Sequence, residues 1–221
     1  MHKNYISNSS SSVRMFKSRF LESVSKVHFW VPLVLYMPVI LFMLIGQLLK
    51  GRSWDSWLLY SFLGVISWTI VEYVMHRFVF HFEPKGKLGR RLHFIIHGVH
   101  HDYPNDQKRL VMPPSLSMPL AILFYLLFKL IVPVSGLAIF YSFFLIGYLV
   151  YDLGHYALHH CHFKNAIFRQ LKKNHMRHHY QDPTKGYGVS SVIWDHALST
   201  AYPKTKQKPP TTVDPKATKL K

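Results

Sequence analysis

Residues 147–160 read GYLVYDLGHYALHH, and this stretch joins the two features that decide the fold. Its first half ends an uncharged run, residues 134–151, that is long enough to cross a bilayer, because a spanning helix needs about 20 mostly apolar residues. Its second half carries His155, His159 and His160. A membrane helix that runs directly into histidines predicts a site at the membrane surface.

Three further apolar runs precede this one. Residues 30–49 are uncharged, residues 57–75 carry only Glu72, and residues 116–132 carry only Lys129. Four such runs in 221 residues would leave a soluble protein with too little polar surface. We therefore predict an all-α integral membrane protein with four transmembrane helices.

The composition agrees with this class. The chain has 27 Lys+Arg against 10 Asp+Glu, a formal net charge of +17, and is 49% hydrophobic. A basic balance suits nucleic acid or an anionic membrane surface, and the long apolar runs favour the membrane. No nucleic-acid-binding motif accompanies the charge. The single cysteine, Cys161, excludes a disulfide framework and a zinc finger built on cysteine pairs.

The distribution of lysine and arginine predicts the orientation in the membrane. Residues 1–29 contain five of them, residues 76–115 contain seven and the chain after residue 151 contains twelve, whereas the two short links between spans contain two and none. Both termini and the central segment are therefore expected in the cytoplasm. The membrane would be that of the endoplasmic reticulum in a eukaryote and the inner membrane in a bacterium.

The domain organisation follows from the same pattern. We expect a polar, basic N-terminal tail at 1–29, one membrane domain at 30–203 and a disordered Lys/Pro-rich tail at 204–221. The N-terminal tail lacks the apolar core of a secretory signal, but its Ser-rich, basic composition leaves a mitochondrial transit peptide open.

Most of the 16 histidines fall in four clusters, at 76–81, 97–101, 155–160 and 175–179. Residues three and four apart share one face of a helix, so each of the last three clusters presents imidazoles on one side. The two histidines of the first cluster are five apart, and they can serve one site only if the helix ends or bends between them. All four clusters lie on segments predicted to be cytoplasmic.

Converging imidazoles suit a metal centre. Neutral imidazole binds Fe, Zn, Cu or Ni, and about ten of them imply two metals, since one metal takes four to six ligands. For His93 and His160, metal ligation, support of a ligand and simple packing stay open. The acids near the clusters are candidates for orienting ligand histidines, with helix capping or surface charge as the alternative: Glu72, Asp102, Asp106, Asp152 and Asp195. Asp152 and Asp102 are favoured, because Asp152 precedes His155 by three residues and Asp102 adjoins His101. The remaining histidines read as surface or interface residues: His2, His28, His162 and His196.

The clusters and their flanks resemble the membrane fatty acid hydroxylase superfamily of histidine-rich diiron oxygenases, and within it the fatty acid 2-hydroxylases. The similarity extends over roughly residues 30–200. Four strings carry it: HRFVFH at 76–81, HGVHHDYPNDQKRLVMPP at 97–114, GYLVYDLGHYALHH at 147–160 and KKNHMRHHYQDPTKGYGVSSVIWD at 172–195.

The resemblance implies four membrane helices under a cytoplasmic helical cap that holds two iron ions, which zinc can replace in purified protein. It implies O2-dependent hydroxylation at C2 of a fatty acyl chain, either as a free fatty acid or within a sphingolipid such as ceramide. Carried over residue by residue, it implies these metal ligands: His76, His81, His97, His100, His101, His155, His159, His175, His178 and His179.

The sequence also bears on the electron donor, the substrate entry and the alternative functions. The chain has no His-Pro-Gly-Gly haem motif, so we expect a separate electron donor such as cytochrome b5 or ferredoxin. The acyl chain is expected to enter between the spans at 57–75 and 134–151. Sterol- and carotenoid-modifying oxygenases share the histidine pattern and stay as alternatives. A membrane metal transporter is an alternative from a different class, disfavoured because transporters place ligands near the bilayer midplane.

Overall fold

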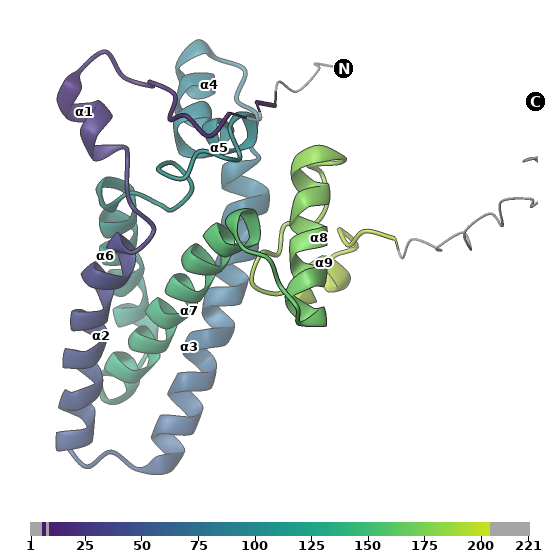
Figure 1. The fold of residues 1–221 in the computed structure, drawn as a ribbon. Coiled ribbons are helices and arrows are strands. Elements are labelled where there is room, and N and C mark those ends of the chain that lie inside the picture. Colours follow the sequence, from purple (N-terminus) through teal and green to yellow (C-terminus); the bar gives the residue numbers. More distant parts are fainter. Residues whose placement is uncertain (1–5, 8, 204–221) are drawn as a thin grey trace, which may run out of the picture.

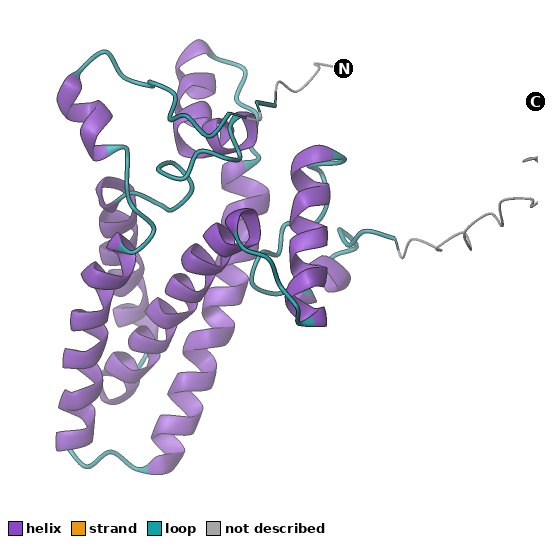
Figure 2. Ribbon diagram, viewed as in Figure 1, coloured by secondary structure: helices purple, strands orange, loops and turns teal. Residues whose placement is uncertain are grey.

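The computed structural model describes residues 6–7 and 9–203, and this part of the chain is helical and contains no strand (Figures 1 and 2). The expected tail at 204–221 lies outside the described residues. The prediction of an all-α protein with four membrane-spanning helices is confirmed. The spanning helices are α2 (Val31–Leu49), α3 (Trp54–Val74) with its π-helical continuation η1 (Met75–Phe80), α6 (Pro114–Ile131) and α7 (Val134–His160).

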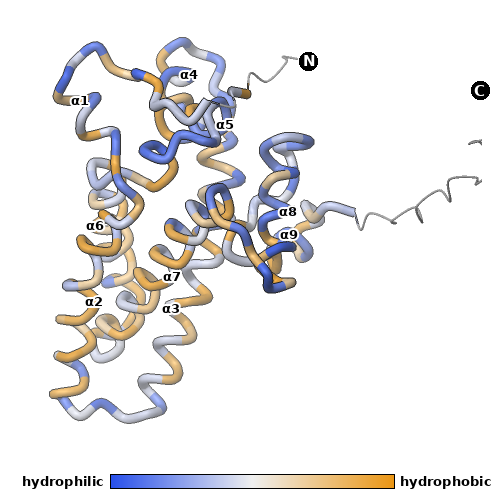
Figure 3. Tube along the Cα trace, in the orientation of Figure 1, coloured by the Kyte–Doolittle hydropathy of each residue, from blue (hydrophilic) through white to orange (hydrophobic). Residues whose placement is uncertain are grey.

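The shorter helices gather near one end of this bundle (Figure 1). Hydrophobic colours dominate the long helices in Figure 3, whereas α4 and α8 are largely hydrophilic. α3 with η1, and α7, run on beyond the apolar runs of the sequence, so histidine clusters lie on direct extensions of two spans. The shorter elements are α1 (Arg19–Val24), α4 (Lys87–His93), η2 (Phe94–Gly98), α5 (Val99–Asp102), α8 (Ala166–Tyr180) and α9 (Ile193–Ala197).

α7 is the central helix of the bundle. In the most apolar 18-residue stretch of α7, 67% of the residues are buried, against 6% in the corresponding stretch of α6. Glycines let α3 and α7 approach closely: a Cβ on Gly64 would lie 2.3 Å from the Phe140 carbonyl oxygen, and one on Gly147 would lie 2.6 Å from Trp68. The entry expected between these two spans is therefore closed at the level of these two glycines.

The outer faces of the long helices are apolar and exposed. Phe42 on α2, Leu58 on α3 and Leu130 on α6 are 79%, 74% and 81% exposed. An exposed apolar surface of this extent marks contact with lipid or protein, and helices of spanning length favour lipid. The same side chains would face the hydrocarbon core of a bilayer.

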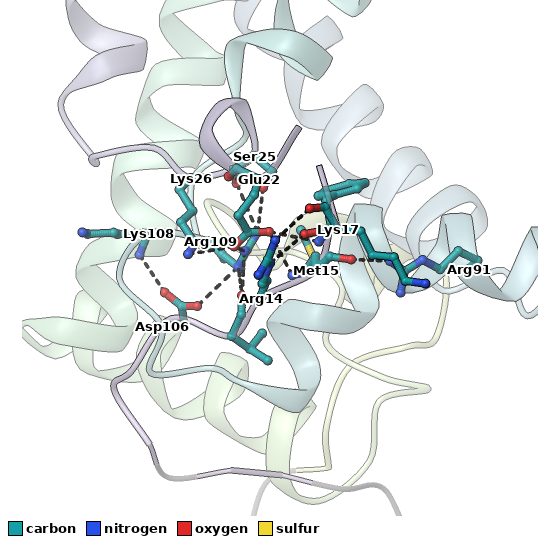
Figure 4. Close-up of polar contacts among 12 residues, drawn as sticks. Arg14, Met15, Lys17, Glu22, Ser25, Lys26, Arg91, Asp106, Lys108 and Arg109 are labelled. Atoms are coloured by element: carbon teal, nitrogen blue, oxygen red, sulfur yellow. Dashed lines mark hydrogen bonds and ion pairs between the residues drawn. The ribbon is translucent and has the colours of Figure 1, made fainter. Parts of the chain in front are cut away.

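The described part of the N-terminal segment packs against the loop before α6, although the sequence suggested a tail (Figure 4). Arg109 explains the difference, because its side chain is 1% exposed and needs acceptors. It donates to the Val13 carbonyl oxygen and to the Ser25 hydroxyl, and it forms an ion pair with Glu22 at 2.6 Å. The Glu22 carboxylate also accepts the Met15 N–H. The segment is therefore tied to the domain by a buried arginine.

Candidate metal centre

A π-helical turn brings together the two histidines of the first cluster, which are five residues apart. In a π-helix each N–H bonds to the carbonyl five residues earlier, and here the His81 N–H donates to the His76 carbonyl oxygen at 3.2 Å. The sequence required a helix end or a bend at this point. The wider turn instead places residues five apart on one side, with the two imidazole centroids 5.0 Å from each other.

The four clusters converge into two groups of five histidines. Within each group, one ring nitrogen from every member lies within 4.8 Å of the others. All ten histidines implied by the family resemblance are in these groups. The first group contains His76, His81, His97, His101 and His178, and the second contains His100, His155, His159, His175 and His179.

The partition follows a simple rule. Each group takes two pairs of histidines that are four or five residues apart in the chain: the first group takes 76/81 and 97/101, and the second takes 155/159 and 175/179. Each then takes one histidine from a doublet, because 100 and 101 point to different groups, and so do 178 and 179. The two groups are therefore neighbours, and the imidazole centroids of His101 and His179 are 4.3 Å apart across the boundary.

Backbone carbonyls fix the tautomer of two histidines in the first group. His76 Nδ1 lies 2.5 Å from the Tyr187 carbonyl oxygen, and His178 Nδ1 lies 2.7 Å from that of Lys185. A carbonyl oxygen can only accept, so each Nδ1 carries the proton. The lone pair is then on Nε2, the nitrogen that faces the other histidines.

The spacing of these Nε2 atoms suits a shared metal better than hydrogen bonds between the histidines. His178 Nε2 lies 2.9 Å from His81 Nε2, and three other Nε2 pairs are 2.8–3.1 Å apart. Metal–imidazole bonds of about 2.1 Å at right angles put neighbouring nitrogens about 3.0 Å apart. Among the described residues, the buried Nε2 atoms of His76, His100 and His155 have no hydrogen-bond partner. A cation between the nitrogens would satisfy these atoms.

Burial keeps the imidazoles outside the spans neutral. Burial, with further lowering by His101 and His178, brings the pKa of His81 to about 2. The same cause holds the pKa of other members of both groups well below its usual value: His97, His100, His101, His175 and His179. Neutral imidazole is the form that binds metal, so the electrostatics of the site favour ligation.

The other histidines that the structure describes lie outside both groups. His93 and His160 are partly buried near the site, and neither is a member. His28, His162 and His196 are exposed, and His2 is outside the described residues.

The two candidate carboxylates lie in different surroundings. Asp152 is buried and accepts hydrogen bonds from the Met112 N–H and the Tyr148 hydroxyl, both at 3.1 Å. It therefore ties α7 to the segment before α6. Asp102 ends α5, and partial burial raises the pKa of its carboxyl. Two other buried carboxylates, Glu72 and Asp195, contact the loop at 185–190. Both are among the acids that the sequence places near the histidine clusters, and Glu72 is also the lone acid of its apolar run.

A cavity of about 230 Å³ opens beside both groups. Its walls include His97 of the first group with His100 and His155 of the second. The N-terminal segment closes another side with Met15 and Leu21. The site therefore combines two groups of potential metal ligands with a partly enclosed, largely apolar space next to them.

Comparison with known proteins supports a specific family. The model of the family described as fatty acid hydroxylase matches residues 61–200. The chain is 37% identical to dihydroceramide fatty acyl 2-hydroxylase FAH2 of Arabidopsis thaliana, over 85% of this chain and 79% of that protein. It is 38% identical to ceramide very long chain fatty acid hydroxylase SCS7 of Saccharomyces cerevisiae, over 82% of this chain and 47% of that protein.

A solved structure has the same fold. The structure titled full length scs7p, in which only the hydroxylase domain is visible, matches with a TM-score of 0.77 and 37% identity. The match covers 84% of this chain and 70% of that chain. The family match at residues 61–200 includes both histidine groups.

Proposed function

The chain belongs to the fatty acid hydroxylase family, and on that basis we propose that it hydroxylates C2 of a fatty acyl chain, free or linked in a ceramide-type sphingolipid. The predicted family is confirmed, and so is the predicted class of enzyme. The relatives do not favour the sterol, carotenoid and transporter alternatives. The observation that carries the proposal is the pair of five-histidine groups beside one partly enclosed cavity.

We propose the ten grouped histidines as ligands of two iron ions, with zinc able to replace iron in purified protein. Bound iron supplies O2 activation, which the side chains of the protein cannot provide by themselves. The reaction consumes one O2, two electrons and two protons for each C–H bond converted to C–OH, and releases one water. A separate one-electron donor, such as cytochrome b5 or ferredoxin, would provide the electrons.

The cavities of the bundle support a route for the acyl chain. The cavity beside the histidines shares Phe80, Met112 and Tyr151 with a smaller apolar cavity of about 50 Å³ inside the bundle. That cavity in turn shares Tyr36 and Leu145 with an apolar groove of about 270 Å³ that α2 and α6 line. We propose that the chain enters through this groove and that its carboxyl end lies near the histidines.

The placement in the membrane follows from the charge pattern. We propose that both termini and the histidine groups face the cytoplasm, because the lysine- and arginine-rich segments lie on that side. The membrane hydroxylase domain would span residues 30–203, in the endoplasmic reticulum of a eukaryote or the inner membrane of a bacterium. Enclosure by the N-terminal segment and by the bundle would keep bulk water from the reacting carbon.

Lipid mass spectrometry under 18O2 tests the function. Cells expressing the chain should accumulate acyl chains that carry one 18O at C2, and cells expressing His100→Ala at the same protein level should not. His28→Ala, at an exposed position, is the matched control and should keep the product. Absence of labelled product with the intact chain, or label at another carbon, would contradict the proposal.

A further inference from the structure

The loop at 185–190 is a tightly built turn beside the first histidine group. Gly186 has φ +70°, which favours glycine, and a Cβ there would lie 2.5 Å from the Tyr202 ring. A Cβ on Gly188 would lie 1.9 Å from the Ser191 carbonyl oxygen and 2.9 Å from an Asp195 carboxylate oxygen. Only a chain without side chains at these two positions can follow this path.

Two buried carboxylates determine the course of the loop backbone. Glu72 on α3 is 4% exposed, and its Oε1 accepts the N–H groups of Val189 and Ser190, both at 2.8 Å. Asp195 on α9 is 2% exposed and accepts the next two N–H groups towards the N-terminus, those of Tyr187 and Gly188, at 2.9 Å. Four successive N–H groups therefore point at carboxylates.

The opposite edge of the same loop holds metal ligands. The carbonyl oxygens of Lys185 and Tyr187 accept the Nδ1 protons of His178 and His76. Both histidines belong to the first group. One peptide segment therefore connects the two carboxylates to the first group: its N–H groups bind the carboxylates, and its carbonyl oxygens bind His76 and His178.

We propose that Glu72 and Asp195 are positioning residues for the first metal site: they shape the loop whose carbonyls hold His76 and His178 in the ligating tautomer. The inference rests on the proposed function, because it assumes that the two groups bind metals. Partners that orient metal-binding histidines typically change metal affinity about 10–100-fold when they are removed. The effect should fall on one of the two metals.

Metal release by a chelator tests this directly. Full-length protein loaded with Zn²⁺ in mild detergent would be equilibrated with rising chelator concentrations, and zinc per chain would be measured at each step. In Glu72→Ala and Asp195→Ala one zinc should leave at a roughly 10–100-fold lower chelator concentration, and the other should leave as in the unaltered protein. Glu72→Gln keeps one acceptor oxygen, so its early zinc should leave at a chelator concentration between those found for Glu72→Ala and for the unaltered protein.

Asp152→Asn is the matched control for burial. Asp152 is 1% exposed and contacts Met112 and Tyr148, so its substitution should leave both release steps in place. Gly188→Ala changes the loop itself and leaves both carboxylates in place. Its added Cβ would meet the Ser191 carbonyl oxygen and should cause the same early release of one zinc. If a carboxylate variant does not fold, Gly188→Ala and Glu72→Gln provide the same readout.

Two results would overturn the inference. One is unchanged release of both zinc ions in the Glu72 and Asp195 variants. The other is equal weakening of both, which would indicate a general structural role. Failure of the proposed function has a different signature, because the unaltered protein itself would then hold fewer than two zinc ions.

Discussion

The two five-histidine groups are built on one plan and supported differently. Each combines two pairs of histidines four or five residues apart with one histidine from a doublet. In the first group, two imidazoles are anchored on carbonyls of the 185–190 loop. In the second, one pair lies on α7 and the other on α8. The buried Nδ1 atoms of His175 and His179 have no hydrogen-bond partner among the described residues. The first group is thus fixed by a loop, and the second by helix packing.

The largest expected effect separates members of the groups from their neighbours. His100→Ala and His178→Ala should each lower hydroxylation by more than about 100-fold, because losing a ligand perturbs a metal more than losing the partner of a ligand. His93→Ala and His160→Ala remove imidazoles outside both groups and should stay within about twofold. Product per chain, measured by lipid mass spectrometry, checks this. Near-normal turnover in either of the first two variants would contradict the assignment.

The difference in support predicts an order of metal release. In the unaltered protein, the second group should lose its metal at a chelator concentration about 10–100-fold below that needed for the first, since the Nδ1 atoms of His175 and His179 have no hydrogen-bond partner among the described residues. The double variant His97→Ala/His101→Ala should remove the later step and leave the earlier one. A single step in the unaltered protein, or loss of the earlier step in this variant, would show that the anchors do not set the order.

Acid should act on both groups in the same direction. Burial lowers the folded-state pKa of the grouped histidines outside the spans, whereas an unfolded chain takes up protons near pH 6.5. The stabilisation is therefore fully present above about pH 6.5 and is lost as pH falls, by about 1.4 kcal/mol per pH unit for each such histidine. Thermal unfolding of loaded protein between pH 8 and pH 5 measures it. A midpoint that rises on acidification would contradict the buried, neutral site.

The smallest effect concerns the helix packing beneath the second group. Gly147→Ala should destabilise the bundle by about 1–3 kcal/mol, because its Cβ would lie 2.6 Å from Trp68. Gly46→Ala meets nothing within 4 Å and should be neutral or stabilising by about 0.5–1 kcal/mol. Unfolding midpoints of the two variants in detergent compare them directly. Equal midpoints would show that the close approach of α3 and α7 is not needed for stability.

Much of this architecture could be predicted from the sequence. Apolar runs long enough to span a bilayer give the four helices, and i, i+4 spacing pairs His97 with His101 and His175 with His179. The assignment of each pair to a group was not predictable, because it depends on how α5 and α8 face each other in space. The π-helical turn between His76 and His81 was also hidden, since local spacing demands a bend without specifying its form.

Tertiary contacts account for the remaining surprises. The N-terminal segment has the composition of a tail, yet the buried Arg109 side chain binds its backbone and Glu22. The sequence places Glu72 near the histidine clusters, but the groups that it binds, the N–H groups of Val189 and Ser190, are more than a hundred residues away. Hydrogen bonds to a distant backbone leave no periodic trace in a sequence, so only the folded chain shows them.

The metal content of two matched double variants tests the central claim most directly. Full-length protein purified in mild detergent should hold about two metals per chain, and His97→Ala/His101→Ala and His175→Ala/His179→Ala should each hold about one, because each removes a pair from one group only. The exposed pair His28→Ala/His162→Ala should keep two. Folded, unaltered protein with a metal content near zero, or a full complement of two metals in both grouped-pair variants, would contradict the two-site account.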